Sequence, residues 1–175
     1  TTLYLGGNQL AGLPDAIGQL TGLKTLILNN NRLAGLPDAI GQLTGLEALI
    51  LNNNQLTAFP TSIGSLTAIT TLYLGGNRIA TLPTAIGGMT ALTTLDLDSN
   101  QLAGLPDAIG QLTGLEELFL GSNQLAALPE SIVALTNLTR LNLNHSPHLI
   151  RSAQSAAVKA WLQALEGSPT CRLST

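Results

Sequence analysis

Residues able to perform acid–base or metal chemistry gather near one point of the chain. Asp96 and Asp98 are separated by one residue, so on an extended strand their side chains would share one face, about 6.6 Å apart. Glu117, Arg140 and His145 follow farther along. Two carboxylates near a histidine can act as general acid and base, and carboxylate oxygens can hold a divalent cation. Whether they do so depends on the elements that position them.

These residues belong to a unit that repeats every 23 residues. The window TTLDLDSN at 93–100 has counterparts such as TTLYLGGN, KTLILNNN and EELFLGSN, while LPDAIGQLTGL occurs identically at 13–23, 36–46 and 105–115. An asparagine recurs with this step at Asn8, Asn31, Asn54, Asn77, Asn100 and Asn123. A proline recurs with it at Pro14, Pro37, Pro60, Pro83, Pro106 and Pro129. The unit reads LxxLxLxxNxLxxLPxxIGxLT, and such a period indicates stacked repeats.

The LxL segment of each unit predicts a short strand, because two leucines separated by one residue share one face of an extended chain. The strands are predicted at residues 3–5, 26–28, 49–51, 72–74, 95–97, 118–120 and 141–143. One strand per unit, always in the same direction, must form a parallel sheet. The LPxxIGxL half would pack on it through short helical or 3₁₀ turns, since Pro and Gly oppose a long helix. Neighbouring units must supply the core, because neither half can bury its apolar face alone.

With these motifs, residues 1 to about 150 resemble the leucine-rich repeat family, specifically the 23-residue LPxxIGxL class of bacterial, plant and intracellular animal proteins. The resemblance implies an α/β fold: a right-handed solenoid, or horseshoe arc, with the parallel sheet on its concave face and the short turns on its convex face. It also implies recognition, since similar proteins commonly bind other proteins through such a domain. Some attach it to a ubiquitin ligase, kinase or GTPase module, and no motif of those modules occurs in this sequence.

The recurring asparagine has a structural explanation. It comes where the chain turns away from the strand, and a carboxamide both donates and accepts hydrogen bonds. A row of Asn side chains would therefore satisfy buried backbone groups from repeat to repeat. The last unit departs from the pattern, with Ser146 at the Asn position and Pro147 after it.

The sequence divides into a solenoid at 1–150 and a C-terminal part at 151–175. Apolar residues of the second part fall at helical spacing, namely Ala157, Val158, Trp161, Leu162 and Leu165. This spacing predicts an amphipathic helix over residues 152–166, ended by Gly167, and then a flexible tail that contains Cys171. We expect the helix to cap the open end of the core, because terminal repeats need a cap. The alternatives are a helix that docks a partner or begins a second domain.

Residues that flank the leucines should point away from the core, onto the concave face. The predicted partner-binding residues there are Tyr4, Ile27, Ile50, Tyr73, Asp96, Asp98, Glu117, Phe119, Arg140 and Asn142. The first four form an apolar, partly aromatic stripe, which is typical of a partner surface, although such residues also favour strands in general. Glycines beside the two tyrosines are expected to clear space for contact: Gly6, Gly7, Gly75 and Gly76.

Catalysis and metal binding are disfavoured at the Asp96 end of this face. Its side chains would lie on an open, solvated sheet, with nothing to close a pocket or to shift a pKa. Glu117 and Arg140 are expected to form a cross-strand ion pair. The two histidines, His145 and His148, have no cysteine partners for zinc. We therefore predict no catalytic residue, no metal site and no cofactor.

Composition narrows the partners and the compartment. Of the 175 residues 45% are hydrophobic and 10% charged, and the net charge is −3 with only seven Lys and Arg. Scattered basic residues make no patch for nucleic acid, and no apolar run approaches the roughly 20 residues of a membrane span. A single cysteine forbids an internal disulfide and favours a reducing compartment. We expect a cytoplasmic protein, or one delivered into a host cytoplasm.

The N-terminus leaves an extracellular location open. No signal-peptide pattern begins the chain, but Thr1 starts in mid-repeat without a preceding Met, which indicates a trimmed fragment. The sequence predicts a non-enzymatic module that binds a protein or peptide on its concave face, as the recognition part of a larger bacterial protein such as an effector. Two alternatives stay open: a structural or self-assembling scaffold without a specific ligand, and a metal or small-ligand binder at Asp96 and Asp98.

Overall fold

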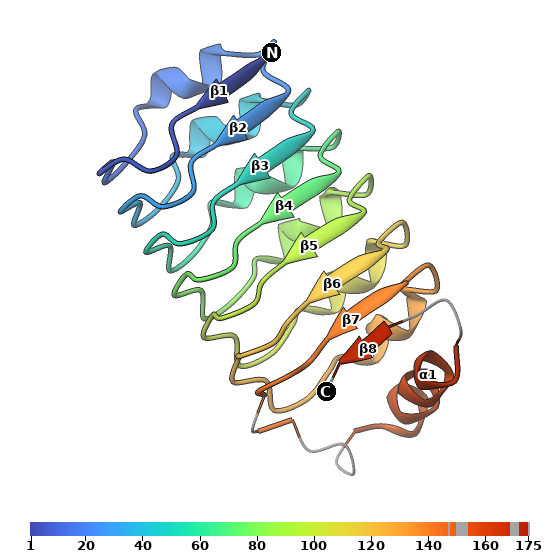
Figure 1. The fold of residues 1–175 in the computed structure, drawn as a ribbon. Coiled ribbons are helices and arrows are strands. Elements are labelled where there is room, and N and C mark those ends of the chain that lie inside the picture. The colour runs from blue at the N-terminus through green and yellow to red at the C-terminus, as the bar shows by residue number, and fades with distance from the viewer. Residues whose placement is uncertain (147, 150–153, 169–171, 175) are drawn as a thin grey trace.

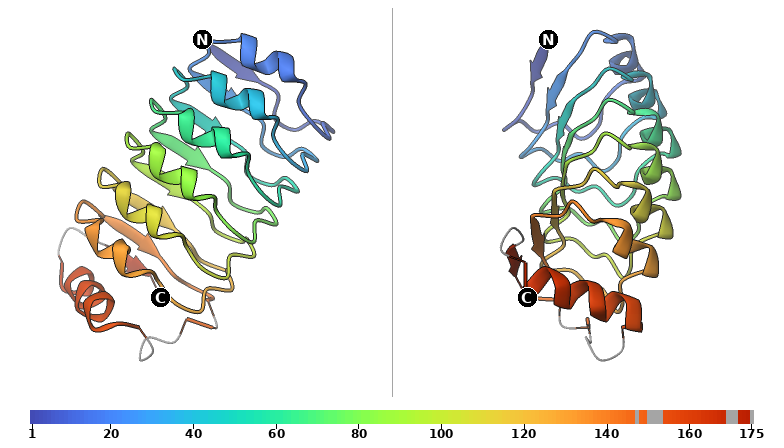
Figure 2. Two further views of the ribbon diagram at one scale, coloured as in Figure 1. Left: turned by 180° about the vertical axis from the view of Figure 1, so that it is seen from behind. Right: turned by 90° about the vertical axis from the view of Figure 1, so that its right-hand side faces the viewer.

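The repeats stack into a solenoid with a parallel sheet along one side and short turns along the other (Figures 1 and 2). The computed structural model describes residues 1–146, 148–149 and 154–168, and the backbone of 172–174. The strands are β1 Thr2–Tyr4, β2 Thr25–Ile27, β3 Ala48–Ile50, β4 Thr71–Tyr73, β5 Thr94–Asp96, β6 Glu117–Phe119, β7 Arg140–Asn142 and β8 Arg172–Ser174. The turns are 3₁₀ helices, η1 Asp15–Gln19, η2 Asp38–Gln42, η3 Thr61–Ser65, η4 Thr84–Gly88, η5 Asp107–Gln111 and η6 Glu130–Ala134.

All strands of the sheet run parallel and lie in chain order, β1 to β8. The predicted strands are present, but each begins and ends one residue earlier than the LxL pattern indicated, as in Thr25–Ile27 for the predicted 26–28. Backbone pairing between strands begins at the residue before the first leucine. It continues past the strand's last residue, where Leu28 N donates to Ile50 O over 2.8 Å. Equivalent residues pair across the repeats, as Leu26 does with Leu49.

The core lies between the sheet and the 3₁₀ turns. Both leucines of an interior LxL segment are fully buried, as Leu49 and Leu51 are at 0% exposure, and the Ile40 of η2 meets them from the other side at 0%. Each turn begins after a proline in extended conformation, and Ile40 N then donates to Pro37 O over 3.0 Å. These bonds span three residues, so the predicted 3₁₀ geometry is confirmed.

The recurring asparagines bind neighbouring repeats together. In the buried Asn77, Oδ1 accepts from Leu56 N at 3.0 Å, and Nδ2 donates to Leu51 O and Leu74 O at 3.0 and 2.8 Å. Asn31, Asn54, Asn100 and Asn123 make equivalent bonds. One side chain thus satisfies three backbone groups from two repeats, as the sequence predicted. At the substituted position, the buried Ser146 Oγ has no partner in the described part of the chain.

An α-helix, α1 (Ala156–Glu166), lies across the C-terminal end of the stack and packs against η6 (Figures 1 and 2). It begins four residues later than predicted because Ser155 caps it, its Oγ accepting from Val158 N at 3.3 Å. The preceding Gln154 is buried and accepts from Leu128 N at 2.9 Å instead of entering the helix. Val158, Leu162 and Leu165 are buried, so the helix caps the core as expected.

The residues after the helix differ from the predicted flexible tail. Arg172–Ser174 form β8, which pairs in parallel register with β7 and extends the sheet beyond the last repeat. Backbone pairing with an open strand edge explains this strand, since its sequence carries no repeat signal. Cys171, placed in the same tail, lies outside the described residues, as does the predicted helix start at 152–153.

Replacing Asn77 with Leu is expected to lower the free energy of unfolding by about 1–3 kcal/mol, because buried backbone groups would lose their partners. Asn8→Leu is the matched control: Asn8 is exposed and donates only to Leu5 O and Gly6 O. Urea denaturation of both variants measures the difference. Equal losses would contradict the assignment of the buried row as the link between repeats.

Candidate partner-binding surface

All ten predicted site residues lie on one face of the sheet, which we call the concave surface. They alternate with core leucines, as Tyr73 does between Leu72 and Leu74, which are 1% and 0% exposed. The residues between the leucines are register partners from strand to strand, in the order Tyr4, Ile27, Ile50, Tyr73, Asp96, Phe119 and Asn142. Glu117 and Arg140 are register partners of each other at the position directly before the first leucine. Asp98 follows β5.

The first four of these residues form a continuous apolar stripe across β1 to β4. Tyr4 is 73% exposed at the end of the sheet, whereas Ile27, Ile50 and Tyr73 are half-buried. Their neighbours in the stripe cover part of each side chain, because parallel strands lie only about 4.8 Å apart. The stripe is therefore a shallow apolar surface.

The glycines beside the tyrosines have other roles in the structure. Gly7 and Gly76 have positive φ, 69° and 70°, and serve the turn that precedes each asparagine. A Cβ on Gly75 would lie 2.9 Å from Asp96 Oδ2 and 3.2 Å from Asn52 Nδ2. The space at Gly75 thus belongs to a polar contact between strands.

That contact fixes Asp96. Its Oδ2 accepts from Asn52 Nδ2 at 3.0 Å, across the intervening β4, and its Oδ1 accepts from the backbone N of Asp98 at 2.9 Å. Asp96 therefore leans toward the N-terminal side of the sheet.

Asp98 makes the mirror arrangement toward the C-terminal side. Its Oδ1 accepts from Gly121 N at 2.6 Å, and Asn142 Nδ2 donates to both carboxylate oxygens, at 3.1 and 2.9 Å. Asn142 Oδ1 in turn accepts from Asn144 N at 3.0 Å. A Cβ on Gly121 would come within 2.7 Å of Asn142 Nδ2, so this glycine also makes room for the bond.

We call the chain Asn52–Asp96–Asp98–Asn142 the polar ladder. Sequence reasoning placed both aspartates and Asn142 on the surface but missed Asn52 and Gly121, and it gave Gly75 a different role. The signal was in the residues after the second leucine, where Gly75 lies between Asn52 and Asp98, and Gly121 between Asp98 and Asn144. The absence of a side chain at each glycine leaves room for Asn52 to reach Asp96 and for Asn142 to reach Asp98.

Burial raises the pKa of Asp98 above its ordinary value, and the negative charge of Asp96 adds to the increase. The hydrogen bonds from Gly121 N and Asn142 act in the opposite direction, because they favour the carboxylate. The net effect is a carboxyl group that holds its proton more tightly in the folded protein than in the unfolded chain.

Arg140 lies beside the polar ladder and is bound by two groups of β6. Its Nη1 is 2.9 Å from Glu117 Oε1, which confirms the predicted cross-strand pair. Its guanidinium carbon lies 5.5 Å from the centre of the Phe119 ring, within the range of a cation–π interaction. The carboxylate and the ring both come from β6 and together hold one cation from β7.

The described residues contain no group of three His, Cys, Asp or Glu side chains that could hold a metal ion. Asp96 and Asp98 accept hydrogen bonds from amide donors. The exposed His145, in the left-handed conformation at φ 55°, makes no hydrogen bond to either of them. The arrangement therefore presents fixed negative charge on an open surface.

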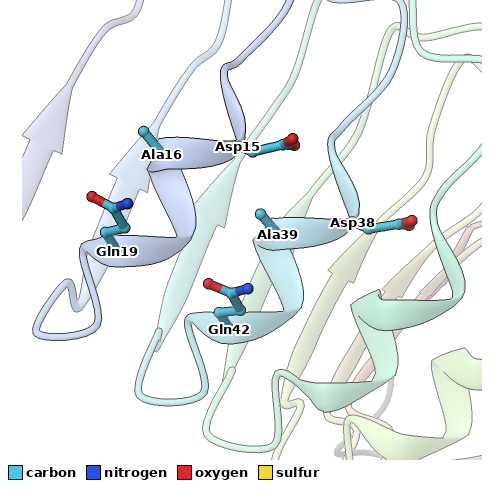
Figure 3. Close-up of a pocket in the computed structure, with 6 residues that line it drawn as sticks. All are labelled: Asp15, Ala16, Gln19, Asp38, Ala39 and Gln42. Atoms are coloured by element: carbon cyan, nitrogen blue, oxygen red, sulfur yellow. The ribbon is translucent and has the colours of Figure 1, made fainter.

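A groove on the turn side has a simpler origin. Asp15, Ala16 and Gln19 of η1 line it together with Asp38, Ala39 and Gln42 of η2, and Figure 3 shows the two sets repeating the same pose. Both turns have the sequence DAIGQ. The groove follows from the stacking of identical units.

The fold and its surface define a class of protein, the leucine-rich-repeat solenoids. A model described as a leucine-rich repeat region matches residues 49–166, and one described as a leucine rich repeat matches residues 1–56. The chain therefore belongs to the leucine-rich repeat family. No curated protein sequence is significantly similar to it. The described residues contain no helix with the length and hydropathy of a membrane span.

The solved structures that are similar to the chain include two leucine-rich-repeat proteins. The leucine-rich-repeat protein LIC12759 of Leptospira interrogans is 36% identical over 81% of this chain, with a TM-score of 0.60. The leucine-rich repeat domain of the type III effector XCV3220 (XopL) is 25% identical over 100% of this chain, with a TM-score of 0.74. The chain spans 42% of the Leptospira protein's length and 68% of the effector domain's length.

Gly75→Ala is expected to lower the free energy of unfolding by about 0.5–1.5 kcal/mol, because the new methyl group displaces the Asn52–Asp96 hydrogen bond. Gly104→Ala is the matched control, since a Cβ there meets nothing within 4 Å; it is expected to be neutral or stabilising by up to about 1 kcal/mol. Thermal unfolding of both variants checks this. A neutral Gly75→Ala would show that the ladder contributes nothing at this strand.

Asp98 is expected to make stability fall as pH rises through its raised folded-state pKa. The folded chain binds this proton more tightly than the unfolded chain, whose aspartates titrate near about 3.9. The stabilising contribution of protonated Asp98 is therefore fully present below the unfolded-state pKa. It is lost as the pH rises through the higher folded-state pKa. Urea denaturation from pH 3 to 7 should show this fall in the wild type relative to Asp98→Asn. A pKa of the Asp98 carboxyl group at or below the ordinary value, measured by carboxyl ¹³C NMR, would contradict this expectation.

Proposed function

We propose that the concave surface binds a segment of another protein or a peptide. The apolar stripe of Tyr4, Ile27, Ile50 and Tyr73 carries this proposal, because apolar side chains in a row outside a core commonly mark a contact surface. The side chains of the opposite sheet face pack in the core, whereas residues of the concave surface can differ between repeats without loss of packing.

Family membership supports the proposal, since leucine-rich-repeat domains are typical protein-interaction modules. The similarity to the leucine-rich repeat domain of a type III effector and to a Leptospira protein supports a further step. We propose that the chain is the recognition part of a larger bacterial protein of effector type, acting in the cytoplasm or in a host cytoplasm.

The surface supports binding without catalysis. Its carboxylates are held by neutral amide donors on an open sheet. Such an arrangement offers neither a poised general base nor exclusion of water. The recognition module therefore contributes affinity and selectivity, and any chemistry of the larger protein would come from another part of it.

Peptides are first selected from a displayed library on the immobilised wild-type domain. Their affinity for the double variant Ile27→Ser/Ile50→Ser is expected to be at least about tenfold lower, a loss of about 1.4 kcal/mol in binding free energy. The reason is loss of apolar contact area at the middle of the stripe. The control is Leu20→Ser, which removes an exposed apolar side chain, 44% accessible, after η1. Fluorescence anisotropy measures both. Selected peptides that bind all three proteins with equal affinity would favour the alternative of a structural scaffold without a specific ligand.

A further inference from the structure

One cation of the chain itself lies on the concave surface, held by two groups of the neighbouring strand. The Arg140 guanidinium lies between a carboxylate, Glu117 at 2.9 Å, and an aromatic ring, Phe119 at 5.5 Å. The carboxylate supplies charge and the ring supplies its electron-rich face. A guanidinium suits both, because it is planar, permanently charged and weakly hydrated.

A ring and a carboxylate occur together again on neighbouring strands, although here each comes from a different strand. Tyr73 and Asp96 are register partners on the adjacent strands β4 and β5, whose backbones lie about 4.8 Å apart, so a ring and a carboxylate project from neighbouring positions of the same face. Here no basic side chain of the described residues forms an ion pair with the carboxylate. The ion pairs found among them are Lys24–Glu47 and Arg140–Glu117.

Asp96 is prepared for such a contact. Its bonds from Asn52 Nδ2 and Asp98 N hold the carboxylate in place, so a partner would not have to order it. Each oxygen accepts one of these bonds and keeps capacity for another. Both donors are neutral, and Asp98 adds a second negative charge nearby, so the charge of Asp96 stays uncompensated within the described chain.

We propose that the concave surface binds a partner segment that places an arginine side chain against Tyr73 and Asp96, next to apolar side chains on Ile27 and Ile50. Charge complementarity and the Arg140 arrangement on the neighbouring strands select this occupant. The inference rests on the proposed function, because it names the chemistry of the segment that the stripe would hold.

The direct test uses two small probes in ¹⁵N NMR titrations of the whole chain: N-acetyl-L-arginine methylamide and its neutral analogue with citrulline. The arginine probe is expected to shift the amide signals of Tyr73 and Asp96 in a saturable, salt-sensitive way, and the citrulline probe is not. Asp96→Asn should weaken binding at least about fivefold, and so should Tyr73→Ser. Asp107→Asn, the same change on the exposed turn η5, should leave it unchanged.

The variant Asp96→Asn can keep the fold. An Asn Oδ1 still accepts from Asp98 N, and the amide of Asn52 can turn over to present its oxygen, which accepts no bond from the described residues. An unchanged dispersion of the NMR spectrum verifies this before each titration. Equal shifts by both probes, shifts elsewhere, or no shifts would overturn the inference.

The library peptides separate this inference from the proposed function. Arginine-containing peptides that need both Ile50 and Asp96 support the two together. Peptides that depend on Ile27 and Ile50, lack basic residues and ignore Asp96→Asn would overturn the arginine contact alone. Arginine binding at Asp96 with no peptide that depends on the stripe would overturn the proposed function and leave only an isolated cation contact.

Discussion

The three hydrogen bonds of each buried asparagine are the interaction on which the rest of the structure depends. The chain must turn away from the sheet inside the core, where backbone groups have no access to water. Asn77 joins Leu51, Leu56 and Leu74, so it connects two successive repeats. This connection sets the strand register, and the register aligns the residues of the concave surface. At the C-terminal end the capping segment makes a different contact, in which Gln154 Oε1 accepts from Leu128 N.

The two faces of the sheet are under different constraints. Core residues such as Leu49 and Ile40 are fully buried, and a change in their volume would open a cavity or force strain. The residues between the leucines have no such neighbours on one side, so Tyr, Ile, Asp, Phe and Asn all occur there. The repeats can therefore differ on this face at little cost in stability.

The polar ladder combines order with charge. Gly75 and Gly121 let amide side chains reach across a strand, so both aspartates are oriented by neutral donors. Their negative charge is therefore not compensated by these donors. Arg140 neutralises only Glu117, on the C-terminal side of the ladder. An apolar stripe followed by fixed negative charge gives the surface a direction along the solenoid axis, which a bound segment would have to match.

Much of this followed from the sequence. The 23-residue period and the LxL alternation determined the parallel sheet, the 3₁₀ turns, the core and the set of residues on the concave surface, because these depend on local spacing that is repeated without interruption. Only the tertiary structure decided that Asp96 bonds to Asn52 and Asp98 to Asn142, each pair 44 residues apart. Several donors lie at similar spacing, and packing selects among them. The strand β8 was decided in the same way, since the open edge of β7 and not a sequence pattern specifies it.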